Sequence, residues 1–546
     1  MKKNNFLEGA MIATIGIVMC KIIGVLYVIP FYKIIGVTGG TLYSYAYSIY
    51  SVFLTLSSTG IPLAISKMVS EYNTLEYYNT KERVYKLGRI IIVAMGFISF
   101  LLLILLAPIL AKFILGDMQG GNTVESVTMV IRVISSALLI VPLLSVTKGY
   151  LQGHKFITPS SISQVIEQIC RVLVIIIGSY CAIKVFDLSV DTAVGIAVFG
   201  ATIGALIAYI YLVSKISKNK KNLNRNIEPN LEETKITTKD LLKKIVFYAL
   251  PFVVIDLVKS AYALVDTMTV VRTLDKLGAS ANYAETTIGV ITTWGTKLNM
   301  IVVSISLGLI VSLIPNVASS YVKKDMKDVN KKINQSLQAL LLVTLPMVVG
   351  ISFLAQPLWN IFYGFDSLSI SIFRIFIFEA LSYSFFTVLI NLMQTLNNTK
   401  VALITLFLSF IGKVVLNIPV MNLCKIVDIP LYLGPIIVTL ITQLFAIIYV
   451  IYVLRKHYQV RLKETLKIYI KIILATIVML LVLIVLEKFI SLNITNRLLS
   501  ILYIGLYAVV GVIIYGIIMV KTNTLEQVLG GNFINDILVK LHLKRK

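Results

Sequence analysis

The residues of this chain that could do chemistry are charged side chains set inside long apolar segments. Glu167 and Arg171 are four residues apart in one such segment, and Asp256 and Lys259 are three apart in another. At either spacing on a helix, the two charges share a face and partly neutralise each other. Because a charge within a bilayer is costly, each pair is a candidate functional site. We expect the pairs to be structural salt bridges or parts of a gate.

Three lysines in comparable segments, Lys21, Lys297 and Lys413, have no acidic neighbour at helical spacing. At 1.5 Å per residue, Lys21 lies roughly 16 Å into its segment. Such a lysine must face an acid from another helix, a lipid phosphate or a hydrated cavity that holds an anion. Lysine binds phosphate as a point charge. We therefore predict a cationic cavity that contains Lys21 and Lys297, with Lys259 as a further contact.

Tyrosines are abundant between the first and third apolar segments. Tyr43, Tyr47 and Tyr50 fall on one face of a helix. They are either part of an aromatic belt at the membrane interface or the lining of a cavity.

Composition places the chain among integral membrane proteins. Hydrophobic residues make up 58% and charged residues 14% of the sequence, and the mean hydropathy is +0.89. The four cysteines show no CxxC spacing, so the sequence suggests neither a zinc site nor a disulfide framework. The three histidines lie in polar segments, which argues against a catalytic or metal-binding histidine inside the membrane.

The apolar segments predict an all-α polytopic membrane protein, because irregular backbone cannot cross lipid. A spanning helix needs about 20 mostly apolar residues, and about 14 segments meet that length. They are residues 10–35, 42–66, 88–115, 126–150, 158–183, 191–214, 244–268, 287–316, 335–357, 369–394, 401–423, 430–454, 466–489 and 498–520.

A polar stretch divides these segments into six before it and eight after it. We expect an N-terminal lobe at residues 1–214, a flexible cytoplasmic linker at 215–243 and a C-terminal lobe at 244–455. Two more spans follow at 456–520, and a basic tail at 521–546. Gln152 and Gln394 precede similar polar turns in the two lobes, a faint repeat of the kind on which transporters are commonly built.

Lysine and arginine concentrate in alternate loops, which predicts that both termini are cytoplasmic. The formal net charge of +24 then follows from loops that face anionic lipid. A nucleic-acid partner is not expected, because the basic residues are scattered over short loops without a binding motif.

Two sequence motifs resemble one family of transporters. They are LTLSSTGIPLAISKMVSE at Leu54–Glu71 and KGYLQGHKFITPSSISQVIEQICRV at Lys148–Val172. Both are similar to the polysaccharide-transport branch of the multidrug/oligosaccharidyl-lipid/polysaccharide flippase superfamily, within it to MurJ-type lipid II flippases and stage V sporulation protein B. The stretches CKIIGVLYVIPFYKIIG and YALPFVVIDLVKSAYALVDT fit the same family. The likeness covers essentially the full chain.

The resemblance implies a fold and an activity. Members have two six-helix lobes in a V-shaped pseudo-repeat plus two C-terminal helices. They translocate undecaprenyl-pyrophosphate-linked peptidoglycan precursor outward across the bacterial cytoplasmic membrane by alternating access. The expected partners are this lipid-linked oligosaccharide, membrane lipids and the cell-wall synthesis machinery, with the protein acting as a monomer and not as an enzyme.

The resemblance also assigns residues. The cationic site of the first helix matches Lys21, but Val28 stands where the family usually has a second arginine, so the site is less basic. The cationic position of the eighth helix falls at Lys297. Some members bind sodium through acids on the seventh and eleventh helices. Here Asp256 or Asp266 is available on the seventh, but the eleventh carries Lys413. Sodium coupling is therefore in doubt, protons or the membrane potential are open alternatives, and no cofactor or metal is expected.

Other functions remain open at this stage. The cargo could be another lipid-linked polysaccharide of the teichoic or capsular type. A cation-coupled drug exporter of the same superfamily would favour acidic cavity residues over lysines. A membrane glycosyltransferase needs acidic catalytic residues in a sizeable outer segment, and the outer loops here are short. A scaffold for envelope machinery that does not transport is the remaining alternative.

Overall fold

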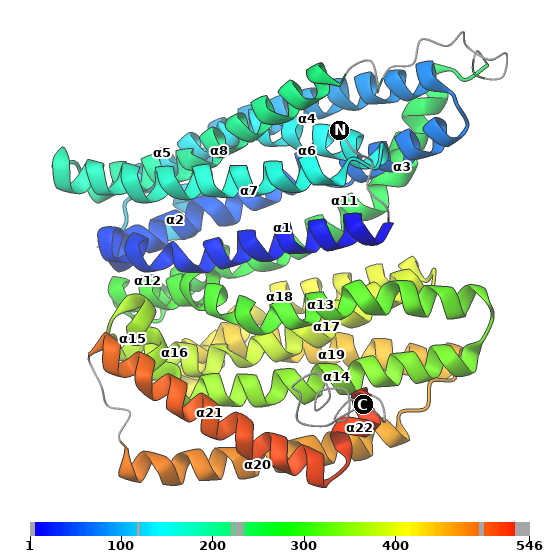
Figure 1. Cartoon of the computed structure of the whole chain (residues 1–546). Helices are drawn as coiled ribbons and strands as arrows, with labels where there is room; N and C mark the ends of the chain where they lie inside the picture. The colour runs from blue at the N-terminus through cyan, green and yellow to red at the C-terminus, as the bar shows by residue number, and fades with distance from the viewer. Residues whose placement is uncertain are drawn as a thin grey trace. The chain divides into compact units, whose positions relative to one another are not determined.

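The computed structural model describes residues 6–116, 121–219, 223, 233, 235–490 and 496–529, and the regular elements among them are all helices (Figure 1). The chain forms two compact units, Met1–Thr293 and Trp294–Lys546. The all-α membrane fold expected from the sequence is thus confirmed.

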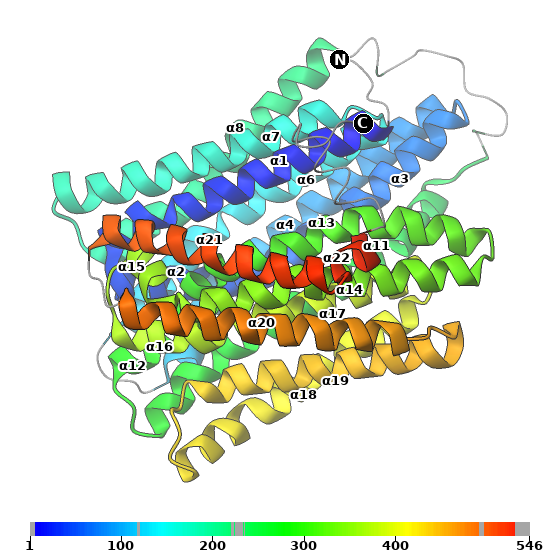
Figure 2. The same ribbon diagram turned by 60° about the horizontal axis from the view of Figure 1, so that its bottom comes forward.

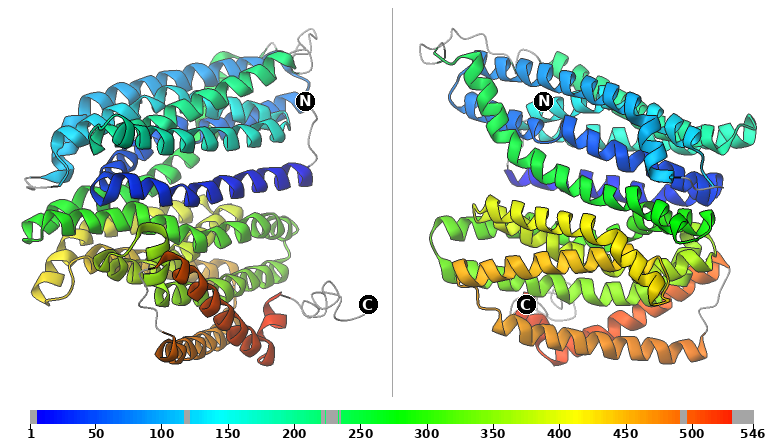
Figure 3. Two further views of the ribbon diagram at one scale, coloured as in Figure 1. Left: turned by 60° about the vertical axis from the view of Figure 1, so that its left-hand side comes forward. Right: turned by 180° about the vertical axis from the view of Figure 1, so that it is seen from behind.

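The first unit contains ten α-helices among the described residues, and two π-helical turns continue α7. They are α1 (Phe6–Leu26), α2 (Val28–Ser58), α3 (Ile61–Thr74), α4 (Tyr78–Leu115), α5 (Val124–Ser135), α6 (Ala137–Gly153), α7 (Ile157–Leu173), η1 (Val174–Gly178), η2 (Cys181–Val185), α8 (Val190–Lys218), α11 (Thr238–Lys276) and α12 (Ala281–Gly289). A further π-helical turn, η3 (Val290–Trp294), runs across the boundary between the units. The long helix α11 can be followed in Figure 3.

The second unit is built in the same way. Its helices are α13 (Gly295–Val322), α14 (Met326–Phe353), α15 (Ala355–Tyr363), α16 (Ser367–Phe376), α17 (Phe378–Thr395), α18 (Thr399–Ile426), α19 (Leu433–Tyr458), α20 (Lys463–Phe489), α21 (Arg497–Lys521) and α22 (Thr524–Leu529). Helices α20 and α21 lie side by side (Figure 2) and pack against α14 and α15. Leu341, Ile472 and Met519 belong to the buried cluster that joins them.

Within the described part of the chain, twelve helices are long and apolar enough to cross a membrane, fewer than the segments expected. The expected span 10–35 is not one helix: α1 ends at Leu26, and α2 is kinked at Gly36, where φ is +68°. Gly60, with φ of +79°, separates α2 from α3 inside the expected span 42–66. The expected span 244–268 lies within α11, a single helix of 39 residues. Glycine adopts these left-handed conformations without the penalty that a side chain would bring, so the kink at Gly36 and the break at Gly60 follow from residue type.

The described residues of the expected linker are not all exposed. Leu223 and Glu233 are buried against the start of α4. The Nζ of Lys81 donates to the carbonyl oxygen of Leu223 at 2.8 Å, and a Glu233 carboxylate oxygen accepts from the backbone N–H of Thr80 at 2.5 Å. Residues 220–222, 224–232 and 234 of the linker, and residues 530–546 of the expected tail, lie outside the described residues.

Helices α3 and α6 approach each other through two glycines of the second motif. A Cβ at Gly149 would stand 2.4 Å from the carbonyl oxygen of Pro62, and one at Gly153 would stand 2.7 Å from that of Ser66. Both distances are shorter than a carbon–oxygen contact allows. Small residues four apart let helix backbones come this close in membrane proteins. The glycines of the motif therefore serve the packing of α6 on α3.

Replacing Gly153 by alanine is expected to lower the free energy of unfolding by about 1–3 kcal/mol, the usual cost of overpacking. The added methyl group would have to displace the α3 backbone at Ser66 or the side chain of Val69. Unfolding in mixed detergent micelles measures the change. Gly505→Ala on α21 is the matched control, because a Cβ there meets no atom within 4 Å. Equal stability of the Gly153 and Gly505 variants would contradict the packing argument.

Candidate functional site

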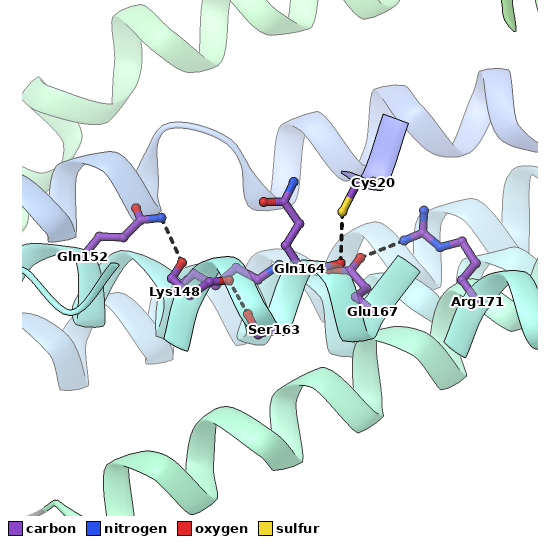
Figure 4. Close-up of polar contacts among 8 residues, drawn as sticks. Cys20, Lys148, Gln152, Ser163, Gln164, Glu167 and Arg171 are labelled. Carbon is purple, nitrogen blue, oxygen red and sulfur yellow. Dashed lines mark hydrogen bonds and ion pairs between the residues drawn. The ribbon is translucent and has the colours of Figure 1, made fainter. Parts of the chain in front are cut away.

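Helix α7 carries a polar stripe along one side and apolar side chains on the other. The exposed apolar side chains include Ile162, Ile169 and Leu173. The polar ones recur every three or four residues, which puts them on one face of the helix. They are Ser160, Gln164, Glu167, Gln168 and Arg171, of which Figure 4 labels Gln164, Glu167 and Arg171.

Glu167 is held between two cations on this stripe. Its Oε1 lies 2.7 Å from Nη2 of Arg171, and its Oε2 lies 2.9 Å from Nζ of Lys148 on α6 (Figure 4). The Glu167 side chain is only 14% exposed. The structure thus brings the two sequence-predicted residues together and adds Lys148, giving a cluster with one net positive charge. We call these three residues the charge triad.

Sequence reasoning missed Lys148 as a member of the triad and left it in the basic turn. It is 19 residues from Glu167, far beyond any spacing within one helix. Only the reversal of the chain between α6 and α7 makes them neighbours. The sequence nevertheless contained a signal for this contact. Lys148 comes before a short turn and Glu167 and Arg171 follow it, and an acid with a cation on either side of such a turn favours pairing of all three.

Arg171 also has an unused donor beside the tyrosine face of α2. Its Nε is buried and has no hydrogen-bond partner among the described residues, as is the case for the hydroxyl of Tyr47. Tyr43, Tyr47 and Tyr50 all lie within electrostatic reach of the guanidinium. Ring centroids are 4.4 Å apart for Tyr43 and Tyr47, and 5.8 Å for Tyr47 and Tyr50. The rings meet at a tilt and edge to face, and their hydroxyls lie near the cation, where they could help hold an anionic group.

Helix α1, which carries Lys21, packs along the polar stripe of α7. The Sγ of Cys20 donates to the carbonyl oxygen of Gln164 at 3.5 Å (Figure 4). A Cβ at Gly16 or Gly24 would stand 3.3 Å from Ser161 Cβ or 3.5 Å from Gln168 Nε2, so α1 follows α7 closely. Lys21 is half-buried and makes no ion pair or hydrogen bond with any other described residue. It is therefore a cation available to a ligand.

The acids of α11 differ in their surroundings. Asp256 and Lys259 form a loose ion pair, with 3.5 Å between Oδ1 and Nζ, and their side chains are 41% and 32% exposed. Asp266 is buried, at 6% exposure. The loose pairing leaves Lys259 accessible to an anion, but in competition with Asp256.

The remaining predicted lysines lie in the second unit. Lys297 is half-buried near the start of α13. Lys413 on α18 is 1% exposed and donates to Oγ1 of Thr439 on α19. This hydrogen bond ties Lys413 into the packing of α18 on α19. Among the described residues, no group of three or more His, Cys, Asp and Glu side chains could hold a metal ion.

Comparison with known families covers most of the chain. The model of the family described as polysaccharide biosynthesis protein matches residues 6–305, and the MatE model matches residues 288–419. The lipid II flippase MurJ of Bacillus subtilis (strain 168) is 32% identical over 471 residues, which cover 85% of this chain and 85% of the relative. Stage V sporulation protein B of the same organism is 23% identical over 366 residues, covering 67% and 68% of the two chains.

Solved structures share the fold. A lipid II flippase MurJ in an inward closed conformation superposes with a TM-score of 0.64 at 17% identity, over 93% of this chain and 98% of that one. A MATE transporter in complex with MaL6 gives a TM-score of 0.55 at 12% identity, over 82% and 95%. Together with the sequence matches, these likenesses show that the chain is a transporter and not an enzyme. It belongs to the MurJ-like flippases of the multidrug/oligosaccharidyl-lipid/polysaccharide flippase superfamily.

Proposed function

We propose that the protein translocates undecaprenyl-pyrophosphate-linked peptidoglycan precursor, lipid II, from the inner to the outer leaflet by alternating access. The observation that carries the proposal is Lys21, a half-buried cation on α1 without an ion pair among the described residues. Its helix packs along α7, whose charge triad is itself net positive. A pyrophosphate head group requires such cations at membrane depth, since uncompensated charges there are costly. The similarity to a lipid II flippase supports the same cargo.

The roles follow from the surroundings of each residue. Lys21 and Lys297 bind the pyrophosphate, and Lys259 contributes when Asp256 releases it. The pair Glu167–Arg171, completed by Lys148, is a strut or gate that keeps α6 and α7 together. If an ion drives transport, Asp256 and Asp266 on α11 are the candidate carriers; Asp266 is buried, and Asp256 forms the loose pair with Lys259.

The chain has a defined orientation in the membrane and is divided into two lobes. Both termini face the cytoplasm of a bacterial cell, and the protein works as a monomer beside the cell-wall synthesis machinery. Residues 1–214 and 244–455 are two lobes of six spans each, joined by the linker 215–243 and followed by spans at 456–520 and a basic tail at 521–546. The boundary between the compact units differs from these, because it follows Thr293.

A second candidate cargo is a lipid-linked polysaccharide of the teichoic or capsular type. The match of residues 6–305 to the polysaccharide biosynthesis family favours it. It shares the carrier and the pyrophosphate with lipid II, so the same lysines would serve either cargo. A drug exporter is less well supported, because the half-buried cation Lys21 suits an anionic cargo.

Complementation tests the proposal. Cells depleted of their own lipid II flippases should grow when this chain is expressed, and lipid II should not accumulate in the inner leaflet. Rescue of a teichoic-type polymer without rescue of peptidoglycan would favour the second cargo. Failure to rescue either, with the protein present in the membrane, would overturn the flippase proposal.

A further inference from the structure

A groove of about 790 Å³ lies in the first unit, and its lining includes neither the charge triad nor Lys21. It is formed by one side of α3, from Leu63 to Leu75 just past its end, and by the end of α6. Pockets that hold drug-sized ligands measure about 300–1,000 Å³, so the groove is large enough for more than a single small ion. Its polar lining consists of Ser66, Lys67, Ser70, Glu71, Thr74 and Gln152.

The groove is where the two family motifs meet. Ser66, Ser70 and Thr74 follow one another at intervals of four residues and form a row of hydroxyl groups along α3. Gln152 comes from the second motif, and its Nε2 donates to Oγ of Ser160 at 3.0 Å, which fixes the amide. The backbone contact at Gly153 holds this end of α6 against Ser66. The packing therefore places an amide beside the hydroxyl row.

The charges around the groove are positive on balance. Lys67 is exposed, with its Nζ 3.8 Å from the ring centroid of Tyr248, and it has no ion pair with a carboxylate in the described part of the chain. Glu71 is already paired, because its Oε1 lies 2.6 Å from Nζ of Lys244. The ring of Tyr72 supports Lys244 at 4.9 Å. Lys67 is thus the cation left for an anion.

We propose that this groove is a binding subsite for the polar head of the lipid-linked glycan, distinct from the pyrophosphate contact at Lys21. Lys67 binds a peptide carboxylate of the head, because the phosphates of the cargo are assigned to Lys21. Ser66, Ser70 and Gln152 hydrogen-bond its sugar hydroxyl and amide groups. Hydroxyl and amide side chains suit the uncharged polar groups of a glycan head, and the cation beside them suits its anionic group. This inference rests on the proposed function.

The edges of the groove fit a lipid-anchored ligand. Leu63 and Leu75 are 49% and 50% exposed and complete the lining. With cytoplasmic termini, the groove opens on the cytoplasmic side, where a precursor must be received before transport. A phosphatidylglycerol head group also offers an anion beside hydroxyl groups, so the experiment separates the two sources.

Equilibrium binding of fluorescent lipid II to the full-length protein in nanodiscs tests the subsite. In zwitterionic nanodiscs, Lys67→Gln should raise the Kd about tenfold, as expected for one charge-assisted hydrogen bond. The triple variant Ser66→Ala, Ser70→Ala, Gln152→Leu should raise it by a similar factor. Lys67→Arg should restore most of the affinity. Lys86→Gln, an exposed lysine on α4 outside the groove, should bind within about twofold of the unmodified protein, since it removes charge without a contact.

A second arm repeats the titration in nanodiscs that contain phosphatidylglycerol. The proposal expects little competition, whereas displacement of lipid II that depends on Lys67 would make the groove a phospholipid site and overturn it. Unchanged affinity for lipid II in Lys67→Gln and in the triple variant would also overturn the subsite. The proposed function would still stand in that case, because the unmodified protein would bind lipid II. Absent binding by the unmodified protein, together with failed complementation, would instead overturn the proposed function.

Discussion

Replacing Glu167 by glutamine is expected to lower the free energy of unfolding by about 3 kcal/mol, the lower end of the cost of breaking a buried ion pair. The substitution leaves Lys148 and Arg171 as two like charges around a neutral amide. Glu167 is 14% exposed, so water can compensate only partly. The Nε of Arg171 already has no partner among the described residues, which increases the loss. Unfolding in mixed detergent micelles measures the effect.

Asp256→Asn is the matched control for this prediction. It removes an acid from another membrane pair, but one with 3.5 Å between its charged atoms and side chains 41% and 32% exposed. Exposed pairs contribute roughly 0–1 kcal/mol, so the expected loss is below about 1 kcal/mol. Adding Lys148→Met to Glu167→Gln should recover part of the stability, because one unpaired cation is removed. Equal losses at Glu167 and Asp256 would show that the triad is not a structural strut.

Replacing Lys21 and Lys297 together by alanine is expected to reduce transport by more than about a hundredfold. Each charge-assisted contact to the pyrophosphate contributes roughly 1.5–3 kcal/mol, and a loss of about 3 kcal/mol corresponds to that factor. Lys259→Ala alone should have a smaller effect, because Asp256 competes for the same ammonium. The measurement is the rate of lipid II flipping by the purified protein in proteoliposomes.

The control for the double variant is Lys86→Ala with Lys112→Ala. Both are exposed lysines on α4, so the net charge changes equally without a change at the proposed site. This variant should flip lipid II at the unmodified rate. If the Lys21, Lys297 double variant flipped lipid II at that same rate, neither lysine would be part of the binding site. The fold assignment would not be affected.

The fold class could be predicted from composition and segment length, but the helix boundaries could not. The length of an apolar segment shows how many consecutive residues are apolar, but an apolar segment can continue through a point where the backbone breaks. Gly60, with φ of +79°, breaks the expected span 42–66, and Gly36, with φ of +68°, kinks α2 just after the expected span 10–35. In the same way, α11 exceeds its expected span, since its first turns are polar yet capped by Thr237 and Asp240.

The candidate site could be predicted only where the partners share one helix. Glu167 and Arg171 are four residues apart, so their contact follows from helical geometry. Lys148 and Thr439 lie on neighbouring helices, and their contacts with Glu167 and Lys413 depend on how those helices pack. The groove at Lys67 and Gln152 was missed for the same reason. Its signal was the pair of motifs, which identified the family before their proximity was known.

Flipping by the purified protein tests the central claim most directly. Proteoliposomes are prepared with lipid II in both leaflets, and an enzyme that cannot cross the membrane modifies the lipid II on the outside. With the protein present, nearly all lipid II should become modified, and with the Lys21, Lys297 double variant only the outer-leaflet fraction should. The account would be contradicted if the folded, unmodified protein were present and only the outer-leaflet fraction of lipid II became modified.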